Sequence, residues 1–274
     1  MIGTGPFGHV PGGAFSTEMP AGPLLYLEES PRWVRVRMGG ETVVSSKRPR
    51  LLHESGRLPV FYFPEADVRT DLLRPSERSE RDDVKGNARF WSLAVGDRVA
   101  EDAAWCFDHP QLDGLVALRW DAADEWLEED ETQVKHARDP YHRLDVRSTS
   151  RHVSVSLAGE RLADSRRTRI LFETGLPPRF YFPADDVRQD VLEPSDRRTA
   201  CAYKGVASYW SVRVGEELEP DLVWFYVSPL HDAAEVRDML AFFNERIDLD
   251  VDGERWERPQ TQWSRSRKST GGNS

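Results

Sequence analysis

The chain has few of the residues and segments on which common sites depend. It contains only two cysteines, Cys106 and Cys201, in 274 residues. They fall at non-equivalent positions of an internal repeat, which argues against a shared disulfide or a cysteine-ligated zinc site. No segment approaches about 18 uninterrupted apolar residues, so no membrane-spanning helix is predicted. The N-terminus lacks a basic start followed by an apolar stretch, and unpaired thiols fit a reducing compartment, so we expect a cytoplasmic protein.

Positive charge and catalytic motifs are also scarce. The 37 Lys and Arg are outnumbered by 47 Asp and Glu, giving a net charge of −10, so we expect no nucleic-acid partner. The sequence contains no glycine-rich phosphate loop and no H-x-x-x-H pair. Its seven histidines do not cluster. We therefore predict no bound metal and no cofactor.

An internal duplication is the most informative feature that is present. Residues 34–110 match residues 153–229 at a constant offset of 119, with 33 identities in 77 positions and no gap. A gapless match gives every turn the same length in both copies, so both copies should fold alike. The longest shared run, Phe-Tyr-Phe-Pro, occupies residues 61–64 and 180–183. Each copy is large enough for a core of its own.

Apolar residues alternate with polar ones within each copy, which predicts strands. Val34, Val36 and Met38 alternate with arginines, and Gly39-Gly40 then allows a tight hairpin turn. The fold class we predict is mainly β, a tandem of two antiparallel sheet domains, each with one short late helix. The predicted division is a tail at 1–26, domains at 27–134 and 135–263, and a tail at 264–274.

The late helix is predicted from spacing in the second copy. Asp232 is a candidate N-cap, and Val236, Met239, Leu240 and Phe243 follow at intervals that place them on one helical face. A shorter counterpart is expected near residues 112–118.

Several strings occur in the same order in both copies and resemble the domain of unknown function 427 family. In the second copy they are DSRRTRILFETG, RFYFPADDVRQDVLEPSD, CAYKGVASYWSVRVG and LVWFYVSP. In the first they are SSKRPRLLHESG, VFYFPEADVRTDLLRPSE, VKGNARFWSLAVG and WDAADEWLEEDE. The resemblance covers about residues 30–263 and implies a bacterial two-domain member.

This resemblance also implies a fold similar to the β-tent group. Members of that group often hold a cysteine-ligated zinc, which this chain lacks the cysteines to bind. A nucleotidyltransferase-like label is attached to the family, although the residues here offer little to support it. The second copy keeps Thr199 and Cys201 of the family pattern, with Ala202 where the pattern has proline. The first copy has acids there, including Asp82.

Aromatic residues at matching positions form the first candidate site. They are Tyr62, Phe63, Trp91 and Trp105 in the first copy, and Tyr181, Phe182, Trp210 and Trp224 in the second. Two or three such rings on one sheet face could line a pocket for a flat or cationic ligand. Ordinary core packing is the alternative. Tyr62 and Phe63 are adjacent and point to opposite faces, so at most one serves a given pocket.

Charged residues form the other candidates. Lys85 and Lys204 each precede a glycine, and Glu54 and Glu173 are their equivalent acids, so a Lys–Glu pair could transfer protons or serve as a structural ion pair. Arginines on one strand face could clamp an anion, or lie on a solvated face; they are Arg48, Arg50, Arg167 and Arg169. Acids at Asp67, Asp71, Asp186 and Asp190 could hold Mg²⁺, although local ion pairing explains them as well.

Three functions stay open at this point. The first is a module that binds a small planar or anionic ligand in an aromatic-lined pocket, with the named tyrosines, tryptophans, lysines and arginines as its lining. The second is an enzyme that uses Lys204, Glu173 and Tyr181, with Cys201 contributing. The third is a structural or interaction protein. No oligomeric state is predicted.

Overall fold

The computed structural model describes residues 23–264, which form two units divided after His142. This division falls eight residues later than the predicted boundary after residue 134. The predicted tails, 1–26 and 264–274, lie almost entirely outside the described residues, although strand β1 (Leu25–Glu29) begins within the first of them. In the part of the chain that is described, no helix is long and apolar enough to cross a membrane.

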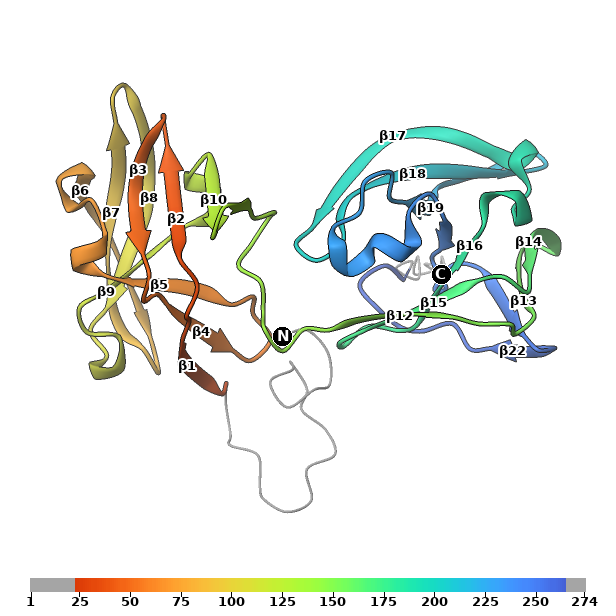
Figure 1. The fold of residues 1–274 in the computed structure, drawn as a ribbon, viewed down its shortest axis with the longest axis horizontal. Coiled ribbons are helices and arrows are strands. Elements are labelled where there is room, and N and C mark those ends of the chain that lie inside the picture. Colours follow the sequence, from red (N-terminus) through yellow and green to blue (C-terminus); the bar gives the residue numbers. More distant parts are fainter. Residues whose placement is uncertain (1–22, 265–274) are drawn as a thin grey trace, which may run out of the picture. The chain divides into compact units, whose positions relative to one another are not determined.

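Each unit contains a seven-stranded and a four-stranded sheet whose strands pair antiparallel, which confirms the predicted mainly β tandem (Figure 1). In the first unit the large sheet has the order β1-β4-β5-β9-β8-β7-β6, with β4 (Arg50–Glu54), β5 (Val60–Pro64), β9 (Leu115–Leu118), β8 (Arg98–Phe107), β7 (Gly86–Val95) and β6 (Leu73–Asp82). The small sheet has the order β11-β10-β2-β3, with β11 (Glu131–Thr132), β10 (Glu125–Glu128), β2 (Val34–Met38) and β3 (Glu41–Ser46).

The second unit repeats this arrangement strand for strand. Its large sheet has the order β12-β15-β16-β20-β19-β18-β17, with β12 (Leu144–Ser148), β15 (Arg169–Glu173), β16 (Arg179–Phe182), β20 (Leu240–Phe242), β19 (Glu217–Phe225), β18 (Gly205–Val214) and β17 (Leu192–Cys201). Its small sheet has the order β14-β13-β21-β22, with β14 (Glu160–Ser165), β13 (Val153–Leu157), β21 (Asp248–Val251) and β22 (Glu254–Trp256). Figure 1 shows β17 and β18 as a long curved hairpin.

The irregularities of the sheets recur as well. The β7–β8 pairing shifts register between Trp91 and Leu93, and the β18–β19 pairing shifts between Trp210 and Val212. The bulges in β2–β3 and β13–β14 also coincide at the offset of 119, and those in β6–β7 and β17–β18 coincide to within one residue. Bulges of this kind re-aim side chains and fix register, so the two units share their detailed geometry and not only their topology.

Short 3-10 helices join the strands: η1 (Glu65–Asp67), η2 (Thr70–Leu72), η3 (Pro110–Leu112), η4 (Trp120–Ala122), η5 (Ala184–Asp186), η6 (Gln189–Val191) and η7 (His231–Val236). The prediction of a helix from Asp232 through Phe243 is wrong, because η7 ends early and the chain enters β20. Leu240 pairs there with Phe182 inside the large sheet, and this long-range pairing overrides the helical spacing. The counterpart expected near residues 112–118 is likewise the end of η3 followed by β9.

The core differs between the units. In the first unit the buried apolar residues form two clusters, one around Phe63 and one around Tyr62, which point to opposite faces of β5. In the second unit a single cluster contains both Phe182 and Tyr181. Val34, Val36 and Met38 lie at most 2% exposed, as their alternation predicts.

Candidate functional site

Both units hold the predicted Lys–Glu pair at the same place. Lys85 follows β6 and its Nζ lies 2.6 Å from Oε2 of Glu54 at the end of β4. Lys204 makes the same bond to Glu173 at the end of β15. The side chains are at most 12% exposed, so both pairs are largely removed from water. The glycine after the first lysine, Gly86, has φ of +86°, and a Cβ there would lie 2.0 Å from a carboxylate oxygen of a neighbouring aspartate, so this turn requires glycine.

Further charges surround the pair in the first unit. Asp82 Oδ2 lies 3.3 Å from Lys85 Nζ, and Arg57 Nε lies 3.2 Å from Glu54 Oε1. Burial opposes ionisation of Asp82, but hydrogen bonds from the backbone N–H groups of Lys85 and Val84, with the ammonium of Lys85, hold its pKa below the usual value. This pair is therefore the centre of a small charge network.

The second unit places neutral groups around its pair. Cys201 stands where the first unit has Asp82, and Tyr226 stands where it has Phe107. Cys201 is a free, half-buried thiol. Burial raises the pKa of Tyr226 well above its usual value, so its phenol stays protonated.

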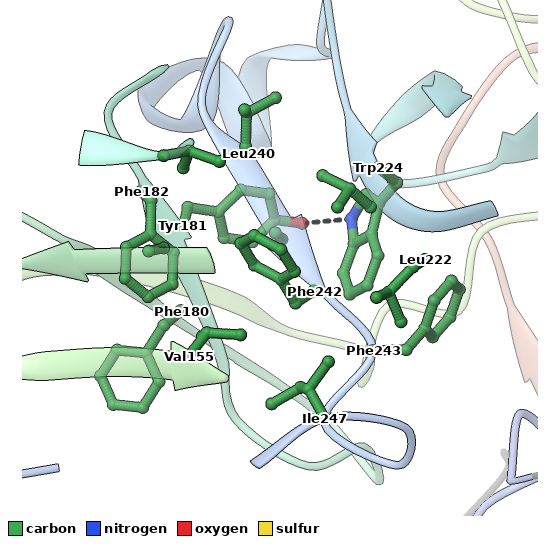
Figure 2. Close-up of a cluster of buried hydrophobic side chains, with 14 of the residues drawn as sticks. Val155, Phe180, Tyr181, Phe182, Leu222, Trp224, Leu240, Phe242, Phe243 and Ile247 are labelled. Carbon is green, nitrogen blue, oxygen red and sulfur yellow. Dashed lines mark hydrogen bonds between the residues drawn. The ribbon is translucent and has the colours of Figure 1, made fainter. Parts of the chain in front are cut away.

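The predicted tyrosines and the second tryptophan of each set meet in the interior. Trp105 Nε1 donates to the hydroxyl of Tyr62 at 3.2 Å, and Trp224 Nε1 donates to that of Tyr181 at 3.0 Å. Figure 2 shows the second pair among Phe242, Leu222 and other apolar side chains. Tyr181 is 1% exposed, and burial raises its pKa far above the usual value; for Tyr62 burial raises the pKa to about 12. Both phenols therefore stay neutral.

The two tryptophans of each set do not line a common pocket. Tyr209 pairs with Trp224 across β18 and β19, whereas Trp210 pairs with Val223, so the two indoles lie on opposite faces of the sheet. Trp210 stacks instead on Phe225 at 5.9 Å. Trp91 and Trp105 are related in the same way in the first unit. The expectation of one space bounded by both indoles is therefore wrong, and Trp224 is core, at 7% exposure.

The four predicted arginines have different partners, and two of them form a repeated structural contact. Arg48 binds Asp67, which also accepts a hydrogen bond from Ser46, and Arg167 binds Asp186 in the equivalent arrangement. The arginine comes first among the causes that hold the pKa of each aspartate below its usual value. Such a contact joins the end of the small sheet to the turn after β5 or β16, which is a structural role.

Arg50 and Arg169 begin β4 and β15 and have different partners. Arg50 Nη2 lies 3.5 Å from a carboxylate oxygen of Glu29, whose side chain is 85% exposed. Arg169 donates to Glu235 on η7. The first contact is long and solvated, so Arg50 is held only weakly.

The remaining predicted acids form local ion pairs. Asp71 binds Arg69, and Asp190 binds Arg188, two residues away along the chain. Among residues 23–264 no three His, Cys, Asp or Glu side chains are grouped so that they could hold a metal ion.

A groove in the first unit is lined by three cationic side chains, Lys47, Arg48 and Arg50. Its volume is about 730 Å³, and residues from β1, β4 and the η3 region line it. The charged and amide side chains of its lining are Glu29, Lys47, Arg48, Arg50, Gln111 and Asp113. Three cations and two acids thus surround an open, polar space, and one of the cations, Arg48, is already bound to Asp67.

A smaller groove of about 360 Å³ shares Lys47 and Arg48 with the first. Trp33 lines it, with Lys47 Nζ 5.2 Å and the Arg35 guanidinium 3.9 Å from the indole centroid. These cation–π contacts orient Lys47 at the rim that the two grooves share. They also place cations against the indole where a flat ligand would stack.

Lys47, Gln111 and Asp113 are not among the site residues predicted from the sequence. One signal was present in the sequence: the gapless repeat stops at Pro110 and Pro229, so the segments that follow differ in length between the copies. Those segments contribute to the groove in the first unit. A difference in length beside a repeated arginine thus marks the place where the copies diverge.

A family model described as Domain of unknown function (DUF427) matches residues 26–129 and, a second time, residues 145–253. No curated protein matches the chain. The two matched segments lie one in each structural unit and together span most of the sequence. The chain therefore belongs to the DUF427 family, as a member with two copies of the domain.

Proposed function

We propose that the protein binds a small anionic ligand in the groove of the first unit. The observation that carries this is the gathering of Lys47, Arg48 and Arg50 around one open space of about 730 Å³. That volume lies within the range of small-molecule sites, roughly 300–1,000 Å³. Such sites are usually apolar, whereas this lining is mostly charged, which favours a charged ligand over an apolar planar one.

The three cations differ in how free they are to meet a ligand. Lys47 makes a cation–π contact with Trp33, and none of the ion pairs among the described residues includes it. Arg50 has only the long contact to exposed Glu29. Arg48 is bound to Asp67 through two nitrogens. We therefore assign most of the attraction to Lys47 and Arg50.

The expected affinity is modest because the groove is open to water. One charge pair at 4 Å contributes about 1 kcal/mol in water. A hydrogen bond to a charged group adds about 1.5–3 kcal/mol. Two cations therefore supply enough for dissociation constants of roughly millimolar, which require about 4 kcal/mol. Salt should weaken the binding, since exposed charges are screened.

The test is a titration of the full chain with acetate and with phosphate at low salt, followed by NMR. Arg50→Ala and Lys47→Ala should each weaken anion binding about fivefold or more. Glu29→Gln should strengthen it, because it removes a competing carboxylate. Arg98→Ala, which removes another exposed cation, bound to Asp124 in the same unit, is the matched control and should leave binding unchanged.

The proposal is refuted if neither acetate nor phosphate binds saturably, or if binding is unchanged in both Arg50→Ala and Lys47→Ala. A cytoplasmic location is part of the proposal and rests on the two free thiols. With a net charge of −10, we expect the ligand to be a small molecule and not a nucleic acid.

The enzymatic alternative receives less support from the geometry. Acid–base chemistry by Lys204, Glu173 and Tyr181 requires these groups to reach a substrate. Their side chains are 11%, 6% and about 1% exposed, and the lysine is bonded to the glutamate. This arrangement favours a structural ion pair over a catalytic one.

A further inference from the structure

The groove arginine of the first unit has a counterpart in the second unit that already carries an anion. Arg50 lies opposite Tyr62 in the large sheet of the first unit. Arg169 lies opposite Tyr181 in the same register of the second. Arg169 Nη1 donates to the carboxylate of Glu235, which comes from the chain itself.

The carboxylate reaches Arg169 because one connection is longer in the second unit. Residues 108–114 join β8 to β9, whereas residues 226–239 join β19 to β20. The longer segment contains η7, which packs against β12, the counterpart of β1. In the first unit the corresponding edge, at β1 and Pro110, lines the open groove. The second unit therefore closes with its own chain the place that the first unit leaves open.

The strand beside each arginine has changed in a complementary way. Glu29 pairs with Arg50 across β1 and β4, and Ser148 pairs with Arg169 across β12 and β15. Where Glu235 supplies a carboxylate from another element, the strand position facing the arginine is a serine and not an acid. Each arginine thus has one carboxylate partner. Glu29 is 85% exposed and lies 3.5 Å from Arg50, whereas Glu235 is 56% exposed and bonds Arg169 at closer range.

We infer that the groove of the first unit takes a small organic monocarboxylate, whose carboxylate binds Arg50 as the Glu235 carboxylate binds Arg169. This inference rests on the proposed anion site and specifies its ligand class. A planar carboxylate matches the fork of a guanidinium. The volume of about 730 Å³ suits a small molecule with an organic portion beyond the carboxylate.

The charge of the lining favours a monoanion over phosphate. Arg48 is balanced by Asp67, so Lys47 and Arg50 face the two acids Glu29 and Asp113, and the lining has no surplus of positive charge for a second negative charge on the ligand. A phosphate dianion would meet the same two acids with an additional charge. The repulsion of that charge costs about 1 kcal/mol in water, which corresponds to roughly fivefold weaker binding.

The experiment compares two anions and two forms of the full chain. In the wild type, acetate should perturb NMR resonances of the first unit with one site per chain, and phosphate should bind at least about fivefold more weakly. Glu235→Ala should leave Arg169 without its carboxylate and create a second acetate site. The double variant Glu235→Ala with Arg169→Ala should return the count to one.

Two further variants keep the test decisive. Glu235→Gln keeps the shape of the side chain, so it serves if the alanine variant does not fold, and it should also expose Arg169 to acetate. Glu254→Ala removes an exposed acid from the same unit at β22 and should keep one site.

The possible failures are distinct. If phosphate binds the wild type as tightly as acetate does, or if neither Glu235 variant gains a site, the carboxylate assignment is wrong while an anion site remains. If neither anion binds the wild type, the proposed function itself fails.

Discussion

The two units enclose the same Lys–Glu bond in opposite kinds of surroundings. In the first unit Lys85 and Glu54 have a further acid and a further arginine beside them, at 3.3 and 3.2 Å. In the second unit a thiol and a buried phenol, Cys201 and Tyr226, take the equivalent places of an aspartate and a phenylalanine. The bond has been kept while its neighbours have changed, which indicates that the bond belongs to the fold.

At the equivalent arginines, Arg50 and Arg169, the strands agree between the units and the connecting segments differ. The strands around Arg50 and Arg169 agree in register, but Arg50 lines an open groove whereas Arg169 is bound to Glu235 of η7. A duplicated domain can therefore diverge at a connection outside the sheet without disturbing the sheet. Function is best sought where the copies differ in chain length, and stability where they agree.

The largest expected effect breaks a charge pair that only the second unit has. Arg179 binds Glu245 through two nitrogens, and their side chains are 7% and 0% exposed. Arg179→Met should destabilise the second unit by about 3–5 kcal/mol, because it leaves a buried carboxylate without this partner. Hydrogen exchange resolved by unit should show the loss in the second unit alone.

The control for this change is Arg143→Met, which removes an exposed arginine bound to Asp145 in the same unit. Its cost should stay below about 1 kcal/mol. Equal losses in both variants would show that the Arg179–Glu245 pair contributes no more than a surface pair.

The next effect compares equivalent tryptophans. Trp224 is 7% exposed and Trp105 is half-buried, although both donate to a tyrosine hydroxyl. Trp224→Ala should cost the second unit about 3–4 kcal/mol, and Trp105→Ala should cost the first unit clearly less. Urea unfolding of each variant measures this, and a larger loss at Trp105 would contradict the view that only Trp224 is core.

A double-mutant cycle sharpens the interpretation of the shared ion pair. Lys204→Met alone should cost about 3 kcal/mol, whereas Lys204→Met with Glu173→Met should cost less, since no buried charge is left behind. The same cycle on Lys85 and Glu54 should recover less stability, because Asp82 and Arg57 then lose the groups that balance them. Full additivity in the second unit would refute a structural pair.

The smallest effect is a difference in pH dependence. Burial alone would raise the pKa of Glu245, but Arg179 outweighs it and the pKa lies below its usual value. Its contribution is therefore present above the unfolded pKa of about 4.3 and is lost as pH falls through the lower folded value. Glu245→Gln should thus destabilise the second unit at pH 7 and do so less at pH 3.

Glu128 in the first unit should behave with the opposite sign. Burial raises its pKa, and Arg32 only partly offsets this. The contribution of Glu128 to the free energy of unfolding is therefore fully present below its unfolded pKa of about 4.3, and it is lost as pH rises through the raised folded pKa. Glu128→Gln should therefore stabilise the first unit more at pH 7 than at pH 4 in thermal unfolding. The same sign for both substitutions would contradict the assigned shifts.

Much of the fold follows from local sequence because one face of each strand is buried. Alternation and turn glycines such as Gly39 predict the hairpins, and the gapless repeat predicts that both units agree. The late helix could not be predicted correctly, because Leu240 and Phe243 have helical spacing and only their partners across the sheet place Leu240 in a strand.

The candidate site was less accessible to such reasoning. The Lys–Glu contact is implied by residues that recur in both copies, yet its burial depends on strands distant in sequence. The alternation rule assigns Trp210 and Trp224 to faces only when the register of β18 on β19 is known. Lys47 belongs to no recognisable sequence pattern, and the open space near it exists because the connection between β8 and β9 is shorter than its counterpart in the second unit.

The coinciding bulges have a consequence for how this chain folds. Because the bulges lie at equivalent positions, a strand of one unit has nearly the right geometry to pair with strands of the other unit while both are unfolded. Adjacent, similar domains are prone to mispair in this way. The 44 of 77 aligned positions that differ, 77 minus 33, separate the right partner from the wrong one.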